Sequence, residues 1–277
     1  MVDDGSSDGT REAIEALGDH RIRTLRHEVS TGVSGARNDG IGAARGAWIA
    51  FCDDDDLWAP DKLERQLAAA ESIRREWAYC GAVKIDERNA IVGGTPPPPP
   101  DVLAKTMPTW SLMPGGCSGV VTSRAALDRA GLFDPKLVNL ADWDLWMRLV
   151  AGGLPAMDPR PLVGYRFHGG QSSLDLELIL REVEMLDGRY GQRVDRGEVH
   201  RYLGWRCVRA GRRGAGARHF GAAFMRKPVP VAADVWGLVR GRIARMLPAL
   251  AEPPRVESAI SGWRRDAEEW LARAPVP

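Results

Sequence analysis

The sequence predicts an α/β domain, in which a mixed sheet is flanked by helices, followed by a helical C-terminal region. Over the first 175 residues, short apolar runs alternate with segments whose apolar residues recur at helical spacing. Loops rich in Gly, Ser, Asp and Pro separate these segments, whereas the remaining chain reads as helical without an obvious repeat. We therefore expect two parts, an α/β domain over residues 1–175 and a helical region over 176–277.

The N-terminal quarter supplies the first predicted elements. Residues 1–2 lead at once into a Gly-, Ser- and Asp-rich loop, in which Asp8 or Ser7 suits the N-cap of a helix over 10–17. A short strand is expected over 22–25, a Gly-rich helix over 34–44 and a strand over 48–52. Pro60 suits the first turn of a further helix, whose apolar positions recur at helical spacing: Leu63, Leu67, Ala70 and Trp77.

The middle of the chain continues the alternation. Strands are expected over 79–85, 90–92, 119–122 and 162–167, with helices over 123–130 and 142–151. The five prolines over 96–100 predict an extended polyproline segment, which is either an exposed spacer or one wall of a binding site.

The composition is that of an ordinary globular protein. Of its 277 residues 44% are hydrophobic, and a net charge of +1 argues against a dedicated nucleic-acid binder. Four scattered cysteines lack the paired spacing of a zinc site, so reduced thiols in the cytoplasm are expected. No signal peptide and no apolar run of about 18 residues is recognisable.

Four consecutive aspartates, Asp53 to Asp56, follow the predicted strand over 48–52. Like charges repel, so a fold that holds them together favours a bound cation. In an extended chain Asp53 and Asp55 would share one face, and such a pair can hold Mg²⁺ or Mn²⁺ while leaving positions for phosphates. The alternative is a solvated acidic turn that caps the next helix.

Four separated segments together resemble the ordered motifs of family 2 glycosyltransferases. They are Val-Asp-Asp-Gly-Ser-Ser-Asp-Gly-Thr over 2–10, Gly-Val-Ser-Gly-Ala-Arg-Asn-Asp-Gly over 32–40, Phe-Cys-Asp-Asp-Asp-Asp-Leu-Trp-Ala-Pro over 51–60 with Lys-Leu at 62–63, and Asp-Trp-Asp-Leu-Trp-Met-Arg over 142–148. The resemblance covers residues 2–175 and implies the GT-A fold, a Rossmann-like mixed sheet with flanking helices, in the α/β domain.

The resemblance also implies roles for individual residues on the donor side. Asp3 or Asp4 would hydrogen-bond the nucleotide base, and Arg37 would brace the ribose, the phosphates or the aspartate-bearing strands. The Asp-x-Asp pair would be Asp53 and Asp55, with Asp55 as the best ligand for Mn²⁺ or Mg²⁺ and Asp53 at the ribose or a metal-bound water.

On the acceptor side, the resemblance makes Asp142 the general base that deprotonates the acceptor hydroxyl, with inversion at the anomeric carbon. The family often has Glu-Asp here, whereas this chain has Ala141 before the aspartate. Asp144 is expected to be structural. His168, after the last predicted strand, would reach the diphosphate or the metal, although a lone histidine is more often structural or exposed.

Family members ordinarily begin with a further strand, loop and helix. We expect either that the chain starts at an internal methionine or that it is a degenerate remnant, and the retained motif residues favour the first explanation. The same gap motivates an alternative function, a non-catalytic descendant that binds a nucleotide or a partner.

The function implied is an inverting transferase that uses a nucleotide-sugar donor and a saccharide or lipid-linked acceptor in cell-surface polysaccharide or glycolipid synthesis. The expected location is the cytoplasm. An apolar stripe with interleaved arginines over 236–250 adds the hypothesis of peripheral contact with the inner face of the cell membrane, against the alternative that the stripe packs on the domain.

Overall fold

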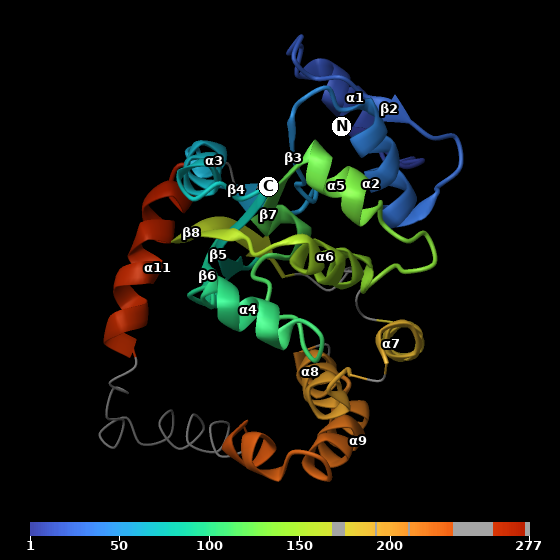
Figure 1. Cartoon of the computed structure of the whole chain (residues 1–277), viewed down its shortest axis with the longest axis vertical. Coiled ribbons are helices and arrows are strands. Elements are labelled where there is room, and N and C mark those ends of the chain that lie inside the picture. Colours follow the sequence, from blue (N-terminus) through green and yellow to red (C-terminus); the bar gives the residue numbers. More distant parts are fainter. Residues whose placement is uncertain (168–174, 192, 210, 235–256, 275–277) are drawn as a thin grey trace.

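A computed structural model describes residues 1–167, 175–191, 193–209, 211–234 and 257–274, and its centre is a six-stranded mixed sheet (Figure 1). The strand order is β3-β7-β5-β8-β4, and β6 pairs with β5 on the same side as β7, farther along the strand. The strands are β3 (Trp48–Ala50), β4 (Leu57–Trp58), β5 (Trp77–Ile85), β6 (Ile91–Thr95), β7 (Val120–Ser123) and β8 (Ala156–Arg166). The predicted fold class is confirmed.

The pairing directions decide where the loops gather. β7 is antiparallel to both β3 and β5, and β5 is parallel to β8. Strands β3, β5 and β8 therefore run in the same direction, and the segments that follow them leave the sheet at the C-terminal ends of these strands, which form one edge of the sheet. The aspartates after β3 and the residues after β8 meet at this edge.

Strand β5 is buried on both faces, which explains its nearly continuous apolar sequence. Trp77 and Tyr79 enter the large core cluster on one face, where the ring of Trp77 stacks on Trp146 with the centroids 6.3 Å apart. The small Ala78 lies on the other face and packs near Ala70 of α3 (Lys62–Ser72). Small residues on this face let the helix approach the sheet closely.

Helices surround the sheet on both sides (Figure 1). The N-terminal end holds α1 (Thr10–Ala16), α2 (Gly32–Ala43) and a small parallel sheet of β1 (Val2–Asp3) and β2 (Leu25–Arg26). Next come α4 (Pro100–Thr106), the 3₁₀ helix η1 (Gly116–Gly119), α5 (Arg124–Ala130) and α6 (Ala141–Gly152). Further helices are α7 (Leu176–Tyr190), α8 (Arg196–Arg209), α9 (Arg213–Phe224) and α11 (Glu257–Leu271).

Two C-terminal helices share the core of the α/β domain. Ile179 and Val183 of α7 and Leu203 of α8 belong to the same buried cluster as Trp146 of α6. The division into parts at residue 175 stays a prediction, and the buried cluster extends across it. None of the described helices is both long and apolar enough to cross a membrane, and the stripe over 236–250 lies outside the described residues.

Several element boundaries differ from the sequence-based expectation. The N-cap of α1 is Gly9, at φ 86°, rather than Asp8 or Ser7, and the carboxylate of Asp8 instead accepts hydrogen bonds from the backbone and side chain of Thr10. Strand β8 begins at Ala156, six residues before the predicted start. The helix α4 was not predicted, because the prolines before it hide the helical pattern; Tyr79 donates a hydrogen bond to the carbonyl of Pro98, so this segment packs on the core.

Candidate functional site

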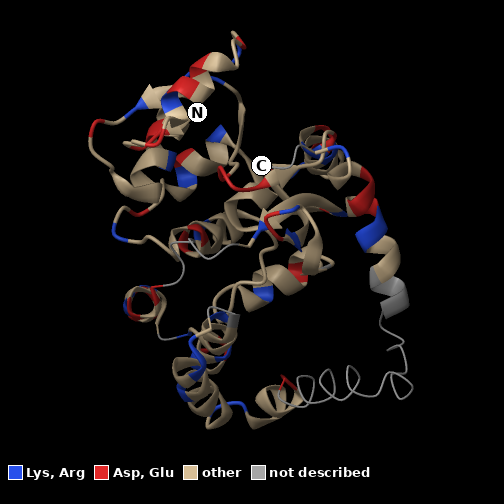
Figure 2. Cartoon of the chain, turned by 180° about the vertical axis from the view of Figure 1, so that it is seen from behind, with Lys and Arg blue, Asp and Glu red and all other residues tan. Residues whose placement is uncertain are grey.

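The four aspartates form a turn between β3 and β4, seen as the acidic loop in Figure 2, rather than an extended segment. The backbone N–H of Asp56 donates to the carbonyl of Asp53 (3.2 Å). The N–H of Asp53 donates to the hydroxyl of Ser118 on η1 (3.0 Å). The expected alternation of side chains is therefore wrong, because the chain turns directly after β3 and each aspartate has its own surroundings.

Asp56 is the buried member of this turn. One of its oxygens accepts a hydrogen bond from the backbone N–H of Arg166 (2.9 Å), which joins the turn to the end of β8. The pKa of Asp56 is raised to about 7, chiefly by burial; hydrogen bonds from Ser118 and Arg166 oppose the rise, and the charges of Asp55 and Asp53 add to it. The turn thus carries repulsion between like charges that a bound cation would relieve.

Arg37 connects the aspartate turn to the rest of the site. It lies on α2 and donates a hydrogen bond to Oδ1 of Asp53 (2.6 Å). Its guanidinium lies over the ring of Phe133, 5.4 Å from the centroid, which fixes its direction. Arg37 is also close enough to Asp142 for its positive charge to lower the pKa of that carboxyl group. This cation therefore lies between two acidic residues that are 89 positions apart in the chain.

Asp142 lies in the first turn of α6 and is partly buried. Its Oδ1 accepts a hydrogen bond from the backbone N–H of Trp143 (2.7 Å). Its Oδ2 faces Gly116, where an added Cβ would lie 3.5 Å from that oxygen. Burial raises the pKa of Asp142 and Arg37 partly offsets the rise. The arrangement leaves Oδ2 as the oxygen available for a proton.

Asp3 and Asp4 lie at the end of β1, and their carboxylates make internal hydrogen bonds. Asp3 accepts from the backbone N–H of Ser6 (2.9 Å) and from Arg26 (2.8 Å). Asp4 accepts from five donors between the end of β2 and the start of α2, namely His27 Nδ1, the hydroxyls of Ser30 and Thr31, and the backbone N–H groups of Thr31 and Gly32. Burial raises the pKa of Asp4, but these hydrogen bonds outweigh it and lower the pKa overall.

The remaining predicted residues fall at different places. Asp55 lies in the turn, partly exposed, and its carbonyl accepts a hydrogen bond from Nε of Arg166 (2.8 Å). His168 lies outside the described residues. Asp144 is fully buried and bonded to Arg148, as expected for a structural role.

The donor set of the turn fits a hard divalent cation. Carboxylate oxygens are the ligands that Mg²⁺ and Mn²⁺ prefer, and such ions are usually held by one or two carboxylates together with substrate phosphates. Among the described residues no group of three or more His, Cys, Asp and Glu is placed to bind a metal.

Sequence reasoning missed two residues that shape the site. Ser118 holds the turn through its hydroxyl, and its carbonyl accepts from the indole N–H of Trp58 (3.0 Å). Gly116, at φ 51°, has a backbone conformation that L side chains rarely adopt, and it brings backbone against the carboxylate of Asp142. Neither has a local sequence signal, because each acts on a residue far away in the chain.

A buried lysine supports the turn from below. Lys62 is fully buried, donates to the side chain of Gln66 (2.6 Å) and lies 4.0 Å from the ring centroid of Trp58. Gln66 in turn donates to the carbonyl of Gly119 (2.8 Å). Burial lowers the pKa of Lys62 to about 8. The network links α3 to η1 and hence to the aspartate turn.

This lysine gives a prediction for stability. Between pH 8 and pH 10.5 the unfolded state binds more protons than the folded state, so the contribution of Lys62 to stability rises with pH. The difference in unfolding free energy between the wild type and Lys62→Met should grow in favour of the wild type by roughly 3 kcal/mol from pH 7 to pH 11. Denaturant unfolding across this range measures it, and a constant difference would contradict the prediction.

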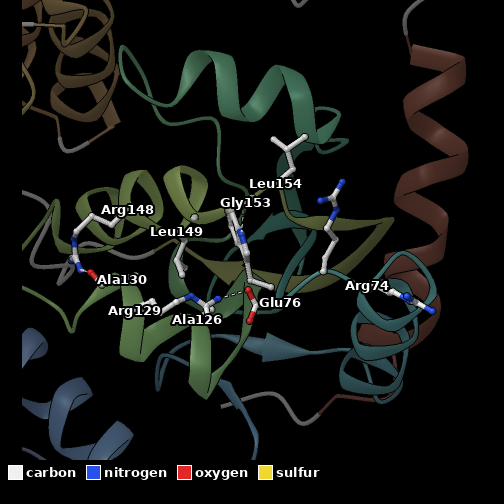
Figure 3. A pocket seen from close by; sticks show the side chains of 12 residues that line it. Arg74, Glu76, Ala126, Arg129, Ala130, Arg148, Leu149, Gly153 and Leu154 are labelled. Atoms are coloured by element: carbon white, nitrogen blue, oxygen red, sulfur yellow. Dashed lines mark hydrogen bonds and ion pairs between the residues drawn. The ribbon is translucent and has the colours of Figure 1, made fainter.

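A cavity of about 310 Å³ lies away from the aspartates, at the other end of α6 (Figure 3). Four arginines and Glu76 surround it, and the C-termini of α3, α5 and α6 end beside it. Arg148 donates to the carbonyl of Ala130 in the last turn of α5 (2.6 Å), and Arg129 pairs with Glu76. Arg129 in the last turn of α5 and Arg148 at the carbonyl of Ala130 complement the partial negative charge at the C-terminus of α5, so we assign this cluster to stability.

Comparison with known proteins gives consistent similarities. Residues 1–129 match the family model described as glycosyl transferase family 2. The chain is 34% identical over 150 residues to UDP-Glc:alpha-D-GlcNAc-diphosphoundecaprenol beta-1,3-glucosyltransferase WfgD of Escherichia coli, covering 54% of this chain and 56% of that protein. It is 46% identical over 91 residues to succinoglycan biosynthesis protein ExoO of Rhizobium meliloti (strain 1021), covering 32% of this chain and 26% of that protein.

Among solved structures, the fold is similar to that of S. aureus TarS 1-349 in complex with UDP-GlcNAc. The TM-score is 0.51 at 16% sequence identity, covering 73% of this chain and 60% of the TarS chain. This likeness concerns the fold, and it confirms the expected GT-A architecture. The chain spans little more than half the length of the first curated relative that it matches.

Proposed function

Because residues 1–129 belong to glycosyl transferase family 2, we propose that this chain is an inverting glycosyltransferase that moves a sugar from a nucleotide-diphosphate sugar to a hydroxyl acceptor. The acceptor class is a saccharide or a lipid-linked saccharide in cell-surface polysaccharide or glycolipid synthesis. The transfer reaction would take place in the cytoplasm or at the inner face of the cell membrane. The similarity to WfgD, whose name contains a nucleotide-sugar donor and a lipid-linked acceptor, and to ExoO, named for succinoglycan biosynthesis, supports this proposal.

One observation carries the proposal furthest. Arg37 donates a hydrogen bond to Asp53, and its positive charge stabilises the carboxylate of Asp142. The guanidinium therefore joins residues from three separate motifs in one site. A donor diphosphate held near Asp53 and an acceptor hydroxyl held near Asp142 would then be neighbours. Convergence of this kind suits a reaction between two bound substrates.

The chemistry of the step follows from Asp142. Its Oδ2 takes the proton of the acceptor hydroxyl while that oxygen forms a bond to the anomeric carbon from the face opposite the leaving group. The bond from the anomeric carbon to the diphosphate oxygen breaks, its electron pair leaves with the nucleoside diphosphate, and the configuration inverts. Burial raises the pKa of Asp142, which makes its carboxylate a better proton acceptor.

The donor side rests on the acidic turn. Asp53 and Asp55 would hold Mn²⁺ or Mg²⁺, which neutralises charge on the diphosphate as it leaves. Arg37 would hold Asp53 in its direction and keep the turn from swinging outward. Asp3 and Asp4 remain predictions as contacts of the nucleotide base, and binding there would use the loop that their carboxylates organise.

A transfer assay tests the proposal. The full chain is incubated with Mn²⁺, a panel of nucleotide sugars that includes UDP-glucose, and a synthetic lipid diphosphate that carries N-acetylglucosamine. We expect a glycosylated lipid with one donor, and loss of product on addition of chelator. Tight binding of a nucleoside diphosphate without product from any donor would favour the non-catalytic descendant instead.

A further inference from the structure

Residues 131–140, which we call the entry loop, connect α5 to α6 and lead the chain into Asp142. The loop contains no helix or strand, so its position depends on contacts with other elements. On one side α2 holds it. The hydroxyl of Ser34 donates to the carbonyl of Leu137 (2.7 Å), and Asn38 exchanges two hydrogen bonds with the backbone of Phe133 (2.9 Å each).

On the other side α7 holds the loop through one carboxylate. Glu182 is fully buried and accepts from three consecutive backbone N–H groups, those of Val138 (2.8 Å), Asn139 (2.9 Å) and Leu140 (2.7 Å). Leu140 is the N-cap of α6 and provides no side-chain hydrogen bond of its own. Glu182 thus takes the place of a local cap at the helix that begins one residue before Asp142.

A second buried carboxylate joins the same elements, but here α6 supplies the acceptor and α7 supplies the donors. Asp144 of α6 is fully buried and accepts from Arg189 (2.5 Å) and from the hydroxyl of Tyr190 (2.8 Å), both near the end of α7. Arg189 also donates to Asp134 in the entry loop (2.5 Å). Two acids and one arginine therefore fix α7 against the loop and the first turn of α6.

The strength of this contact comes from charge and burial. Hydrogen bonds to a buried carboxylate are stronger than those between neutral groups, and loss of the acceptor leaves backbone donors unsatisfied. The entry loop has no regular structure of its own that could replace them. The direction in which Asp142 points thus depends on α7, which lies beyond the residues matched by the family model.

We propose that Glu182 is a positioning residue for the general base Asp142, acting through the entry loop, an inference that rests on the proposed function. Within the part of the chain that the structure describes, the hydrogen bonds of Glu182 go to the backbone of the entry loop and not to the aspartate turn or Arg37. Its removal should therefore disturb the acceptor side of the reaction and leave the donor side intact. Small errors in the placement of a reacting group are costly, on the order of 100-fold in rate for about 1 Å.

The test compares Glu182→Gln with Glu184→Gln, an exposed position on the same helix. Glutamine keeps the shape of the side chain but turns an amide N–H₂ toward backbone donors. For Glu182→Gln we expect kcat to fall about 10- to 100-fold, with the KM for the donor and the affinity for UDP in Mn²⁺ unchanged within about two-fold. Glu184→Gln should match the wild type in all three quantities.

The outcomes separate the inference from the proposed function. Equal kcat values for wild type and Glu182→Gln would overturn the inference alone. A fall in UDP affinity in step with kcat would also overturn it, since the donor side would then depend on Glu182 as well. No transfer by the wild type would overturn both. If Glu182→Gln does not fold, Glu182→Asp decides, because it keeps the carboxylate but shortens the side chain by one methylene; we expect kcat to fall about two- to five-fold with donor KM unchanged, and an unchanged kcat would overturn the inference.

Discussion

Asp142→Asn should lower the turnover number by about 1000-fold or more while the protein still folds and binds its donor. Asparagine is close in shape to aspartate and can still accept the hydrogen bond from the N–H of Trp143. It cannot take a proton from the acceptor at neutral pH. Steady-state kinetics with saturating donor and acceptor measure the effect.

The control for this variant is Asp128→Asn on α5, an exposed aspartate outside the site. It changes the net charge by the same amount and should retain full turnover. Retention of more than about a tenth of the wild-type turnover by Asp142→Asn would mean that another group takes the proton, because general-base catalysis typically contributes 100- to 10,000-fold.

Asp55→Ala should abolish the metal-dependent part of nucleotide binding. We expect the affinity for UDP in Mn²⁺ to fall by about 100-fold or more, toward the value that the wild type shows in chelator. The physical reason is that the metal joins the carboxylates to the diphosphate, so loss of its main protein ligand also removes the bridge. Isothermal titration calorimetry with UDP gives both affinities.

The neighbouring residue provides a matched control for that substitution. Asp54 is exposed in the same turn and carries the same charge. Asp54→Ala should leave UDP affinity in Mn²⁺ within about three-fold of the wild type, because the turn is held by backbone bonds of Asp53 and Asp56. Equal losses in both variants would indicate a nonspecific effect of charge rather than a metal ligand.

Much of the fold could be predicted from local pattern. The run over 77–85 is apolar at nearly every position because β5 is buried on both faces, and the helical spacing around Trp143 and Trp146 follows the buried side of α6. The start of β8 and helix α4 were missed because Pro159, Pro161 and the prolines over 96–100 obscure periodicity. The GT-A architecture came from the ordered motifs and not from periodicity.

The candidate site was predictable in its parts but not in its connections. Motif resemblance singled out Arg37, Asp53 and Asp142, and the structure places Arg37 between the two aspartates. Ser118 and Glu182 could not be found this way, because each acts across 40 or more positions through a hydrogen bond to backbone. Whether these residues bind donor and acceptor stays a prediction.

The aspartate turn shows why residue spacing alone gave the wrong directions for the side chains of Asp53 to Asp56. The alternation expected for a strand separates Asp53 and Asp55 from their neighbours, but the chain leaves β3 at Ala50 and turns. The turn is closed by bonds to Ser118 and Arg166, which are 65 and 110 positions away from their partners. Tertiary contacts thus decided the local conformation.

The most direct test measures donor binding and sugar transfer together in Asp142→Asn. Wild type and variant are titrated with UDP in Mn²⁺ by calorimetry, and the same samples are then assayed for transfer with the donor identified for the wild type. The proposed division of the site predicts equal UDP affinity and almost no transfer in the variant. Transfer at the wild-type rate, or loss of UDP binding together with transfer, would contradict it.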